Sequence, residues 1–261
     1  MRPRYALPFA VLVTMPAFAV DRVSYPYPGV THVHRSEAGA EAHVVTIDLQ
    51  AAVEVVATRP RERWATVSMW AREQGAQIAI NANFFQDSVC GLAMGDGRIW
   101  RDSYVEQCDA TIAFGRSRTG WQGAIIDTEG LIRENPVPWA TEIVSGMPIL
   151  LQRGSVFFDE HEPNGMYRTH PRTAIGLTAD GSTLVLAEIE GRRPGLRGAT
   201  SLEIIPLLEE FGACDAINLD GGGSSQLWIE SEGGIVNHPS DGRERVVANH
   251  LGLRLAFAPR R

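Results

Sequence analysis

Residues 216–227 read AINLDGGGSSQL, and their types and spacing suit the binding and cleavage of a polar ligand. The apolar run 216–219 predicts a short buried strand, and Asp220 stands at its end, where a catalytic carboxylate is expected. The next five residues are Gly221, Gly222, Gly223, Ser224 and Ser225. Because glycine adopts positive φ and admits a ligand close to the backbone, the run predicts a concavity whose N–H groups and hydroxyls hold an anion or a sugar hydroxyl. The structural alternative is a glycine-rich hairpin in which Asp220 caps its own turn.

Other polar clusters fall at predicted strand ends or turns, where side chains from separate strands meet in one crevice. They are Asn81 with Asn83, Arg172 with Thr173, Glu190-Gly191-Arg192, Asn218 with Asp220, and the run from Asn237 to Arg245. Arginine suits phosphate because its planar guanidinium forms two parallel charge-assisted hydrogen bonds. Asparagine suits sugar hydroxyls because it both donates and accepts. Asp220 and Glu190 could divide the acid and base or nucleophile roles of acetal cleavage.

Each cluster also has a structural interpretation. Asn81 and Asn83 are of a type that forms turns, Arg172 could pair with a surface carboxylate, and residues 190–192 could be an ordinary hairpin turn. The sequence contains no G-x-S-x-G, which disfavours a serine hydrolase, and no G-x-x-x-x-G-K, which disfavours a nucleotide-binding P-loop.

Metal binding is not expected. Neither C-x-x-C nor H-x-x-x-H spacing occurs. His32 and His34 alternate on one strand face, but the sequence offers no evident third ligand, so solvated histidines are the favoured interpretation. One alternative stays open, in which Asp220 and neighbouring carbonyl or Asn oxygens hold a hard cation such as calcium.

Two helices and many strands must position these residues. Residues 61–75 predict a helix with Trp64, Val67, Trp70 and Ala71 on one face, which Gly75 ends. Residues 201–211 predict a second helix with a T-x-x-E capping box at Thr200 and Glu203 and with Gly212 following. Pro206 should bend that helix or confine its regular part to the residues that follow.

Strand-like runs occupy much of the remaining chain. They are 43–58, as two strands around a turn near Gln50 and Ala51, then 77–80, 110–114, 121–126, 143–151, 172–178, 183–189, 215–219, 225–230 and 246–257. Many strands and two main helices predict an α+β fold with a largely antiparallel or mixed sheet. No linker or internal repeat divides the chain, so we expect a single domain.

The first nineteen residues have the pattern of a signal peptide, with Arg2 and Arg4, an apolar run, and Ala17-Phe18-Ala19 as a cleavage site. We therefore expect residues 20–261 to form an exported mature domain, periplasmic or secreted. The chain carries a formal charge of −7, and losing the two arginines leaves −9. No basic run interleaved with aromatic residues occurs, so nucleic acid and anionic membrane surfaces are unexpected partners.

Export permits a disulfide among the three cysteines. Cys90 and Cys108 flank a polar, glycine-containing segment, and joining them would close a loop worth about 3 kcal/mol in the chain-entropy model. Cys214 lies between a predicted helix end and a predicted strand, where a buried free thiol is common. We predict a Cys90–Cys108 bridge and a free Cys214.

The chain also resembles a known family, the phosphodiester glycosidases, over residues 30 to 257. The resemblance rests on segments in the same order: INANFF (80–85), RTAIGL (172–177), EIEGRR (188–193), FGACDAINLDGGGSSQL (211–227) and NHPSDGRERVVANHLGL (237–253). It implies hydrolysis of a sugar-1-phosphodiester, and for bacterial members a link to exopolysaccharide or cell-wall glycans. It also implies that the family's motif positions are Asn83, Arg172, Asp220, the loop 221–225, Arg192, Asn237 and Arg245.

One position departs from the family pattern. Family members usually read Asp-Gly-Arg where this chain has Glu190-Gly191-Arg192. The longer side chain moves the carboxylate by about one C–C bond, whereas a catalytic site holds its geometry within about 0.5 Å. Either Glu190 is not catalytic or the substrate differs. The departure keeps open the alternative of a non-catalytic module that binds phosphorylated or anionic glycans.

Overall fold

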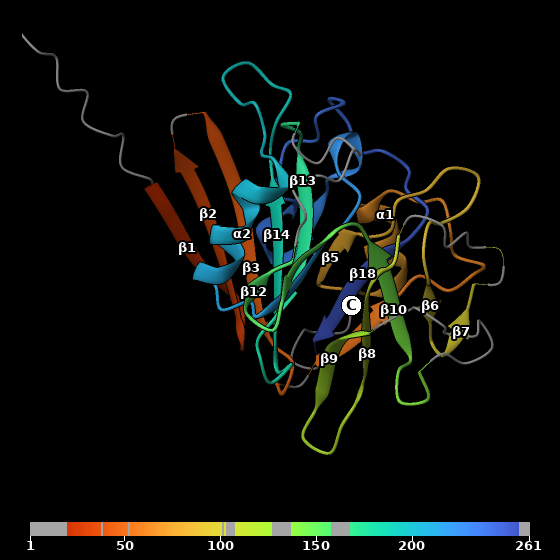
Figure 1. Cartoon of the computed structure of the whole chain (residues 1–261). Helices are drawn as coiled ribbons and strands as arrows, with labels where there is room; N and C mark the ends of the chain where they lie inside the picture. Colours follow the sequence, from red (N-terminus) through yellow and green to blue (C-terminus); the bar gives the residue numbers. More distant parts are fainter. Residues whose placement is uncertain are drawn as a thin grey trace, which may run out of the picture.

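The computed structural model describes residues 20–37, 39–51, 53–100, 102, 108–126, 137–157 and 168–255. The predicted signal peptide, residues 1–19, lies outside them. Within this part of the chain, strand pairings are antiparallel and form three sheets around a shared core, with two α-helices (Figure 1). The predicted single-domain α+β fold is confirmed.

The largest sheet has eight strands in the order β1-β2-β3-β14-β13-β15-β11-β12. Their bounds are β1 Val20–Tyr27, β2 Val30–Glu37, β3 Ala40–Asp48, β14 Thr183–Ile189, β13 Arg172–Leu177, β15 Asp215–Asn218, β11 Ile149–Gln152 and β12 Ser155–Val156.

Two five-stranded sheets complete the core. The first has the order β17-β16-β5-β18-β4, with bounds β17 Gly234–Ile235, β16 Leu227–Ile229, β5 Ile78–Asn81, β18 His250–Leu255 and β4 Val53–Ala57. The second has the order β7-β6-β10-β8-β9, with bounds β7 Arg98–Ile99, β6 Met94–Gly95, β10 Glu142–Gly146, β8 Ala110–Arg116 and β9 Trp121–Ile126.

Alternation along the strands explains how the sheets pack. In β13, Ile175 and Leu177 face the core shared with Ile80 of β5 and Phe114 of β8. Ala174, on the opposite face of β13, packs in a second cluster that covers the outer side of the large sheet. Because both faces of β13 are buried, its six residues read as a nearly continuous apolar run.

Each α-helix covers the outer face of one sheet. Helix α2 (Ser201–Glu210) packs against the large sheet and lies in front of β14 in Figure 1, whereas α1 (Val67–Gln74) packs beside β5. The predicted capping box of Thr200 and Glu203 is confirmed. Gly75 ends α1 with a φ of 64°, also as predicted.

Three predicted boundaries are wrong. The helix predicted over 61–75 begins after Thr66, which caps it, so Trp64 precedes it. Helix α2 runs through Pro206 rather than starting after it, and Pro206 is exposed, so the carbonyl that loses its donor can bond water. The strand predicted over 143–151 is two strands in different sheets, separated by the cis peptide of Met147-Pro148.

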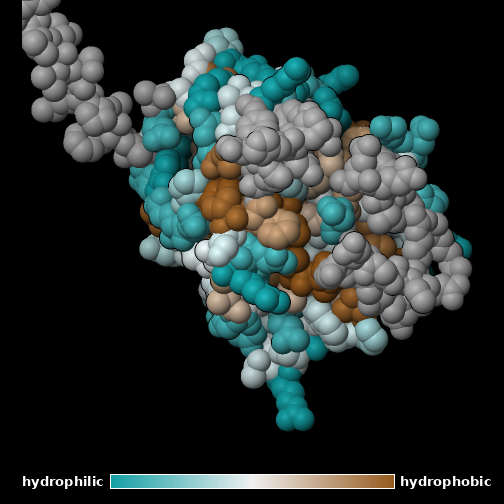
Figure 2. Space-filling view, viewed as in Figure 1, coloured by the Kyte–Doolittle hydropathy of each residue, from teal (hydrophilic) through white to brown (hydrophobic). Residues whose placement is uncertain are grey.

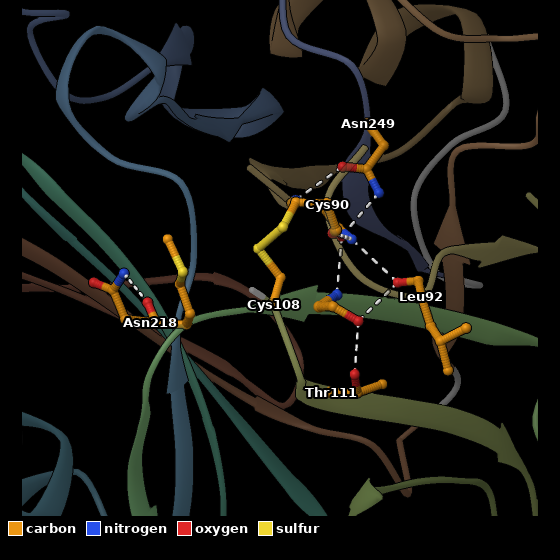
Figure 3. Close-up of a disulfide and its surroundings, with 9 residues drawn as sticks. Cys90, Leu92, Cys108, Thr111, Asn218 and Asn249 are labelled. Carbon is orange, nitrogen blue, oxygen red and sulfur yellow. Dashed lines mark hydrogen bonds between the residues drawn. A yellow bond between two sulfur atoms is a disulfide. The ribbon is translucent and has the colours of Figure 1, made fainter. Parts of the chain in front are cut away.

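The predicted Cys90–Cys108 disulfide is present, and Cys214 is free. Figure 3 shows the bridge between Asn249 on one side and Thr111 on the other. The bridged segment also supplies the carbonyl of Cys90 that accepts a hydrogen bond from Asn83 at 2.8 Å. The disulfide therefore fixes a segment that contacts a predicted site residue.

We expect the double variant Cys90→Ser/Cys108→Ser to lose about 3 kcal/mol of unfolding free energy, because the bridge closes a loop of 18 residues in the unfolded chain. Urea denaturation measures the loss. Cys214→Ser is the control and should change stability by less than about 0.5 kcal/mol. Equal midpoints for the double variant and the unaltered protein would contradict the loop-entropy argument.

Hydrophilic residues dominate the rim of the face seen in Figure 2, and hydrophobic residues gather near its centre. The exposed large hydrophobic residues include Val156, Phe157 and Leu202. No helix in the described residues is long and apolar enough to cross a membrane.

Candidate active site

Several of the predicted site residues lie at one end of the central strands β14, β13 and β15 of the large sheet. Strand β13 is antiparallel to both of its neighbours, so its first residue lies beside the last residues of β14 and β15. Arg172 pairs with Ile189, which precedes Glu190, and Ala174 pairs with Asn218, which precedes Asp220 by two residues. These strand ends therefore converge. The crossover containing α2, which joins β14 to β15, passes over one intervening strand, β13.

The glycine turn after β15 connects two sheets. The Leu219 N–H donates to the Thr173 carbonyl of β13 at 2.8 Å, and the Asp220 N–H donates to the Ala82 carbonyl after β5 at 3.0 Å. Gly222–Ser224 then form a 3₁₀ turn. Asp220 is thus held where the large sheet meets the sheet of β5.

Two arginines flank this glycine turn. Gly222 has a φ of 64°, and a Cβ there would lie 2.9 Å from Nη1 of Arg192. A Cβ at Gly223 would collide with the guanidinium of Arg245. The positive φ favours glycine at position 222, whereas at position 223 a side chain would have to displace the ends of Arg245 and Asp241.

Arg172 adds a third, buried cation. Its Nε donates to the Ala199 carbonyl at 3.0 Å and its Nη2 to the Arg168 carbonyl at 2.8 Å. Burial, and secondarily the charge of Arg192, lowers the pKa of Arg172 to about 10, so it is still positive at neutral pH. Arg245 is paired with Asp241, so Arg172 and Arg192 are the guanidinium groups near the turn whose charge suits a phosphate.

Asp220 has the titration behaviour of a functional carboxyl. Part of its side chain reaches the surface, but the carboxyl group is closely surrounded, and burial raises its pKa to about 6. Hydrogen bonds from Ser224 and the Gly221 N–H, together with the charge of Arg245, oppose that rise. Arg245 Nη1 also lies 3.4 Å from Ser224 Oγ. Such perturbed carboxyls in clefts are candidates for catalysis.

The sequence analysis missed His170, which joins this group. Its Nδ1 lies 3.0 Å from Nη2 of Arg192. Because a guanidinium only donates, Nδ1 is the acceptor and the proton of the neutral ring is on Nε2. Burial and the charges of Arg192, Arg172 and Arg168 lower the pKa of His170. Its position two residues before Arg172 was the available signal.

Asn81 and Asn83 are buried, and their side-chain amides form hydrogen bonds within the protein. The Asn81 amide donates to the Asp220 carbonyl at 2.6 Å, and its oxygen accepts from Thr173 Oγ1 at 3.0 Å. Asn83 donates to the carbonyls of Cys90 and Leu92, while its oxygen accepts from the Ser145 N–H and the Asn249 amide. This geometry favours structural roles over the predicted catalytic contact of Asn83.

Asn218, Asn237 and Ser225 lie behind the turn. Asn218 donates to the carbonyls of Met147 and Leu219, and its Oδ1 is buried without a hydrogen-bond partner. Asn237 donates to the Ser225 carbonyl at 3.0 Å and accepts from the Leu227 N–H at 2.9 Å. The Ser225 hydroxyl is buried without a partner. These residues shape the turn, whereas Ser224 contacts Asp220 directly.

Glu190 is buried in a separate group of partners. His238 donates to its Oε1 through the backbone N–H at 2.9 Å, and Arg193 pairs with its Oε2. Burial alone would raise the pKa of Glu190, but hydrogen bonds from His43 and His238 and the charge of Arg193 outweigh it and lower the pKa to about 2. The partners of Glu190 and of Asp220 have no member in common. Glu190 therefore has the environment of a structural anion.

We expect Glu190→Gln to cost about 1–3 kcal/mol of stability, because it removes the buried anion that accepts the His238 N–H and pairs with the partly exposed Arg193. Glu210→Gln, which removes an exposed partner of Arg35, is the control and should cost less than about 1 kcal/mol. Urea titrations give both values. Loss of turnover in Glu190→Gln with unchanged stability would instead identify Glu190 as catalytic.

Glu188, also missed in the sequence, lies two residues earlier on β14 and is 1% exposed. Neither of its oxygens has a hydrogen-bond partner, although Asn237 is near enough to oppose the shift in pKa weakly. Burial, and then the charge of Glu190, raises the pKa of Glu188 well above its usual value.

The fold and site together define a class of protein: an antiparallel α+β hydrolase-like domain with a cationic glycine turn beside a carboxyl group of raised pKa. A family model described as phosphodiester glycosidase matches residues 74–254. This chain belongs to the phosphodiester glycosidase family.

Two curated relatives illustrate the similarity. Mouse N-acetylglucosamine-1-phosphodiester alpha-N-acetylglucosaminidase is 29% identical over 197 residues, which cover 69% of this chain and 37% of the mouse protein. The SPbeta prophage-derived uncharacterized protein YomE of Bacillus subtilis is 30% identical over 201 residues, which cover 72% of this chain and 29% of that protein. The chain thus matches little more than a third of the mouse relative and less than a third of YomE.

Solved structures share the fold. The catalytic domain of zebrafish N-acetylglucosamine-1-phosphodiester alpha-N-acetylglucosaminidase, auto-inhibited by its pro-peptide, has a TM-score of 0.64 and 20% identity, covering 93% of this chain and 85% of that chain. A hypothetical protein from Synechocystis has a TM-score of 0.66 and 16% identity, covering 90% of this chain and 64% of that one.

Proposed function

We propose that this protein hydrolyses a sugar-1-phosphodiester and releases the sugar from a phosphate-bearing partner. The observation that carries the proposal is the carboxyl of Asp220, with its pKa of about 6, beside a glycine turn flanked by Arg192 and Arg245. Membership of the phosphodiester glycosidase family supports it. The mouse relative is named for cleavage of an N-acetylglucosamine-1-phosphodiester.

The geometry suggests a division of roles. Arg172, Arg192 and the N–H groups of the glycine turn would hold the phosphate, and Asp220 would act at the anomeric carbon as nucleophile or base. The bond from the anomeric carbon to the phosphate oxygen breaks, that oxygen keeps the electron pair, and water supplies the new hydroxyl. The arginines stabilise the charge that develops on the departing phosphate monoester.

We further propose that the reaction takes place in the periplasm or outside the cell, on exopolysaccharide or cell-wall glycans. The predicted signal peptide and the Cys90–Cys108 disulfide support export. The net negative charge supports neither nucleic acid nor an anionic membrane surface as partner.

The test is incubation with a panel of synthetic sugar-1-phosphodiesters, beginning with one of N-acetylglucosamine. Free sugar and phosphate monoester appearing in equal amounts would support hydrolysis. Saturable binding without free sugar would instead identify a glycan-binding module. No cofactor is proposed for the cleavage step. A rate unchanged by adding Ca²⁺ to chelator-treated protein would exclude the calcium alternative at Asp220.

A further inference from the structure

A chain of hydrogen bonds crosses the inner face of the large sheet, away from the glycine turn. Strands β2 and β3 are neighbours in the large sheet (Figure 1), and they carry His32 and His43. Glu232 Oε2 lies 2.7 Å from His32 Nδ1, and His32 Nε2 lies 3.0 Å from His43 Nδ1. At the far end, His43 Nε2 lies 3.7 Å from Glu190 Oε1.

This chain of hydrogen bonds determines which ring nitrogens of His32 and His43 carry protons when both rings are neutral. A carboxylate only accepts, so His32 Nδ1 carries the proton given to Glu232. His32 Nε2 is then an acceptor and takes the Nδ1 proton of His43. The remaining nitrogen, His43 Nε2, faces Glu190 Oε1: it presents a lone pair when the ring is neutral, and it donates to Glu190 when the ring is protonated.

Further donors surround the same carboxylate oxygen. His238 Nδ1 lies 3.1 Å from Glu190 Oε1, and the ligand atoms of Glu41, Glu190 and His238 all lie within 4.8 Å of one another. Glu41 is two residues from His43 on β3, so strand alternation puts both on one face. Arg193 pairs with the other oxygen, Oε2, while Oε1 also accepts the His238 backbone N–H at 2.9 Å.

Two separations at Glu190 are close to those around a tetrahedral ion. Ligands at about 2.0–2.1 Å from a tetrahedral zinc ion are about 3.4 Å apart. The separations of His238 Nδ1 and His43 Nε2 from Glu190 Oε1, 3.1 and 3.7 Å, lie on either side of that value. Metal-ligating histidines generally donate their other ring N–H to a second group, as His43 does to His32.

A nearby orphaned carboxyl is an independent observation. Glu188 precedes Glu190 by two residues on the same strand face and is 1% exposed, and neither of its oxygens has a hydrogen-bond partner. A buried polar group without a partner is costly. A divalent cation at Glu190 would offset that cost electrostatically.

We propose that Glu41, Glu190 and His238 bind a divalent transition-metal ion such as Zn²⁺, with His43 as the imidazole beside Glu190. A mixed set of imidazole and carboxylate ligands suits zinc and its neighbours better than calcium or magnesium, which prefer oxygen ligands. The ion would position the segment of Glu190, and hence Arg192 two residues later, without contacting the cleaved bond. The Zn²⁺-binding test is independent of the hydrolysis assay, because the protein can bind Zn²⁺ whether or not it hydrolyses a sugar-1-phosphodiester.

The test is calorimetric titration of untagged, chelator-treated protein with Zn²⁺, with Ca²⁺ as the comparison ion. We expect one saturable Zn²⁺ site per chain, no comparable Ca²⁺ site, and a melting temperature that rises with Zn²⁺ concentration. His238→Ala and Glu41→Gln should each weaken Zn²⁺ binding by at least about 10-fold. His32→Gln, which removes the support of His43, should weaken it by about 10–100-fold.

Glu37→Gln is the matched control, because Glu37 is an exposed carboxylate on the same β2–β3 hairpin as Glu41, and its Zn²⁺ affinity should be unchanged. His238 is largely exposed, so His238→Ala tests the site even if His32→Gln does not fold. Absence of a one-to-one Zn²⁺ site in the unaltered protein would overturn the proposal. Equal affinities in the unaltered protein, His238→Ala and Glu41→Gln would overturn it too.

Discussion

Asp220→Asn should lower kcat on a cleavable sugar-1-phosphodiester by about 10²–10⁴, the usual contribution of a positioned acid or base. Asparagine keeps the size of the side chain and removes its ability to take a proton or attack carbon. Asp215→Asn is the control, since Asp215 lies at the opposite end of β15 and its carboxylate accepts a hydrogen bond from the Arg153 N–H. Substantial turnover by Asp220→Asn would refute the assignment.

The pH dependence of the rate is a second test of the role of Asp220 in the reaction. Its pKa is raised to about 6 by burial. A carboxylate acting as nucleophile or base must be ionised, so kcat/KM should fall as the pH drops below about 6. A rate that instead falls as the pH rises above 6 would show that Asp220 donates a proton. Initial rates between pH 4.5 and 8 distinguish the two.

The same substitution should stabilise the protein. Because burial raises the pKa of Asp220, the folded state binds its proton more tightly than the unfolded chain does. Stability is therefore lost as the pH rises from about 4 to about 6, and at neutral pH the ionised group costs up to about 3 kcal/mol. Asp220→Asn removes this cost, so its urea midpoint at pH 7 should rise while activity disappears. A lower midpoint would show that the ionised carboxylate stabilises the fold.

Arg172→Ala should reduce kcat/KM by about 10²–10³, the typical effect of removing one charge-stabilising donor from an active site. It also removes the Arg172 donors to the carbonyls of Ala199 and Arg168, but the Ala199 carbonyl keeps the His170 N–H and Arg168 is exposed, so the lost hydrogen bonds should cost only about 1 kcal/mol of stability. Arg172→Lys keeps the charge but lacks the planar fork, so it should recover only part of the activity.

The control is Arg35→Ala, which removes an arginine paired with Asp21 and Glu210 on the periphery of the same sheet. Its kinetics should match those of the unaltered protein. Activities are compared only for variants that remain folded by circular dichroism. If Arg172→Ala folds and hydrolyses the substrate at an unchanged rate, Arg172 does not bind the phosphate.

Local sequence determined much of the scaffold and the centre of the site. The capping box at Thr200, the glycine that ends α1, the Cys90–Cys108 pairing and the run from Asp220 to Ser225 depend on neighbours in the chain, so their residue types were sufficient signals. The helix start at Thr66 and the break at Met147-Pro148 were misjudged, because apolar residues continue across both positions while the fold changes direction there.

Only the tertiary structure shows which polar side chains are hydrogen-bonded within the protein. Asn83 and Arg172 are both candidate site residues in the sequence. In the structure, the Asn83 side-chain amide is hydrogen-bonded on both its nitrogen and its oxygen to groups within the protein. The pKa of Asp220 near 6 and that of Glu190 near 2 arise from burial and from partners distant in the chain. In the sequence, His32 and His34 had no evident third metal ligand. In the structure, His43 and His238 both lie beside Glu190. Contacts between residues far apart in the chain are set by strand order and register, which no local pattern encodes.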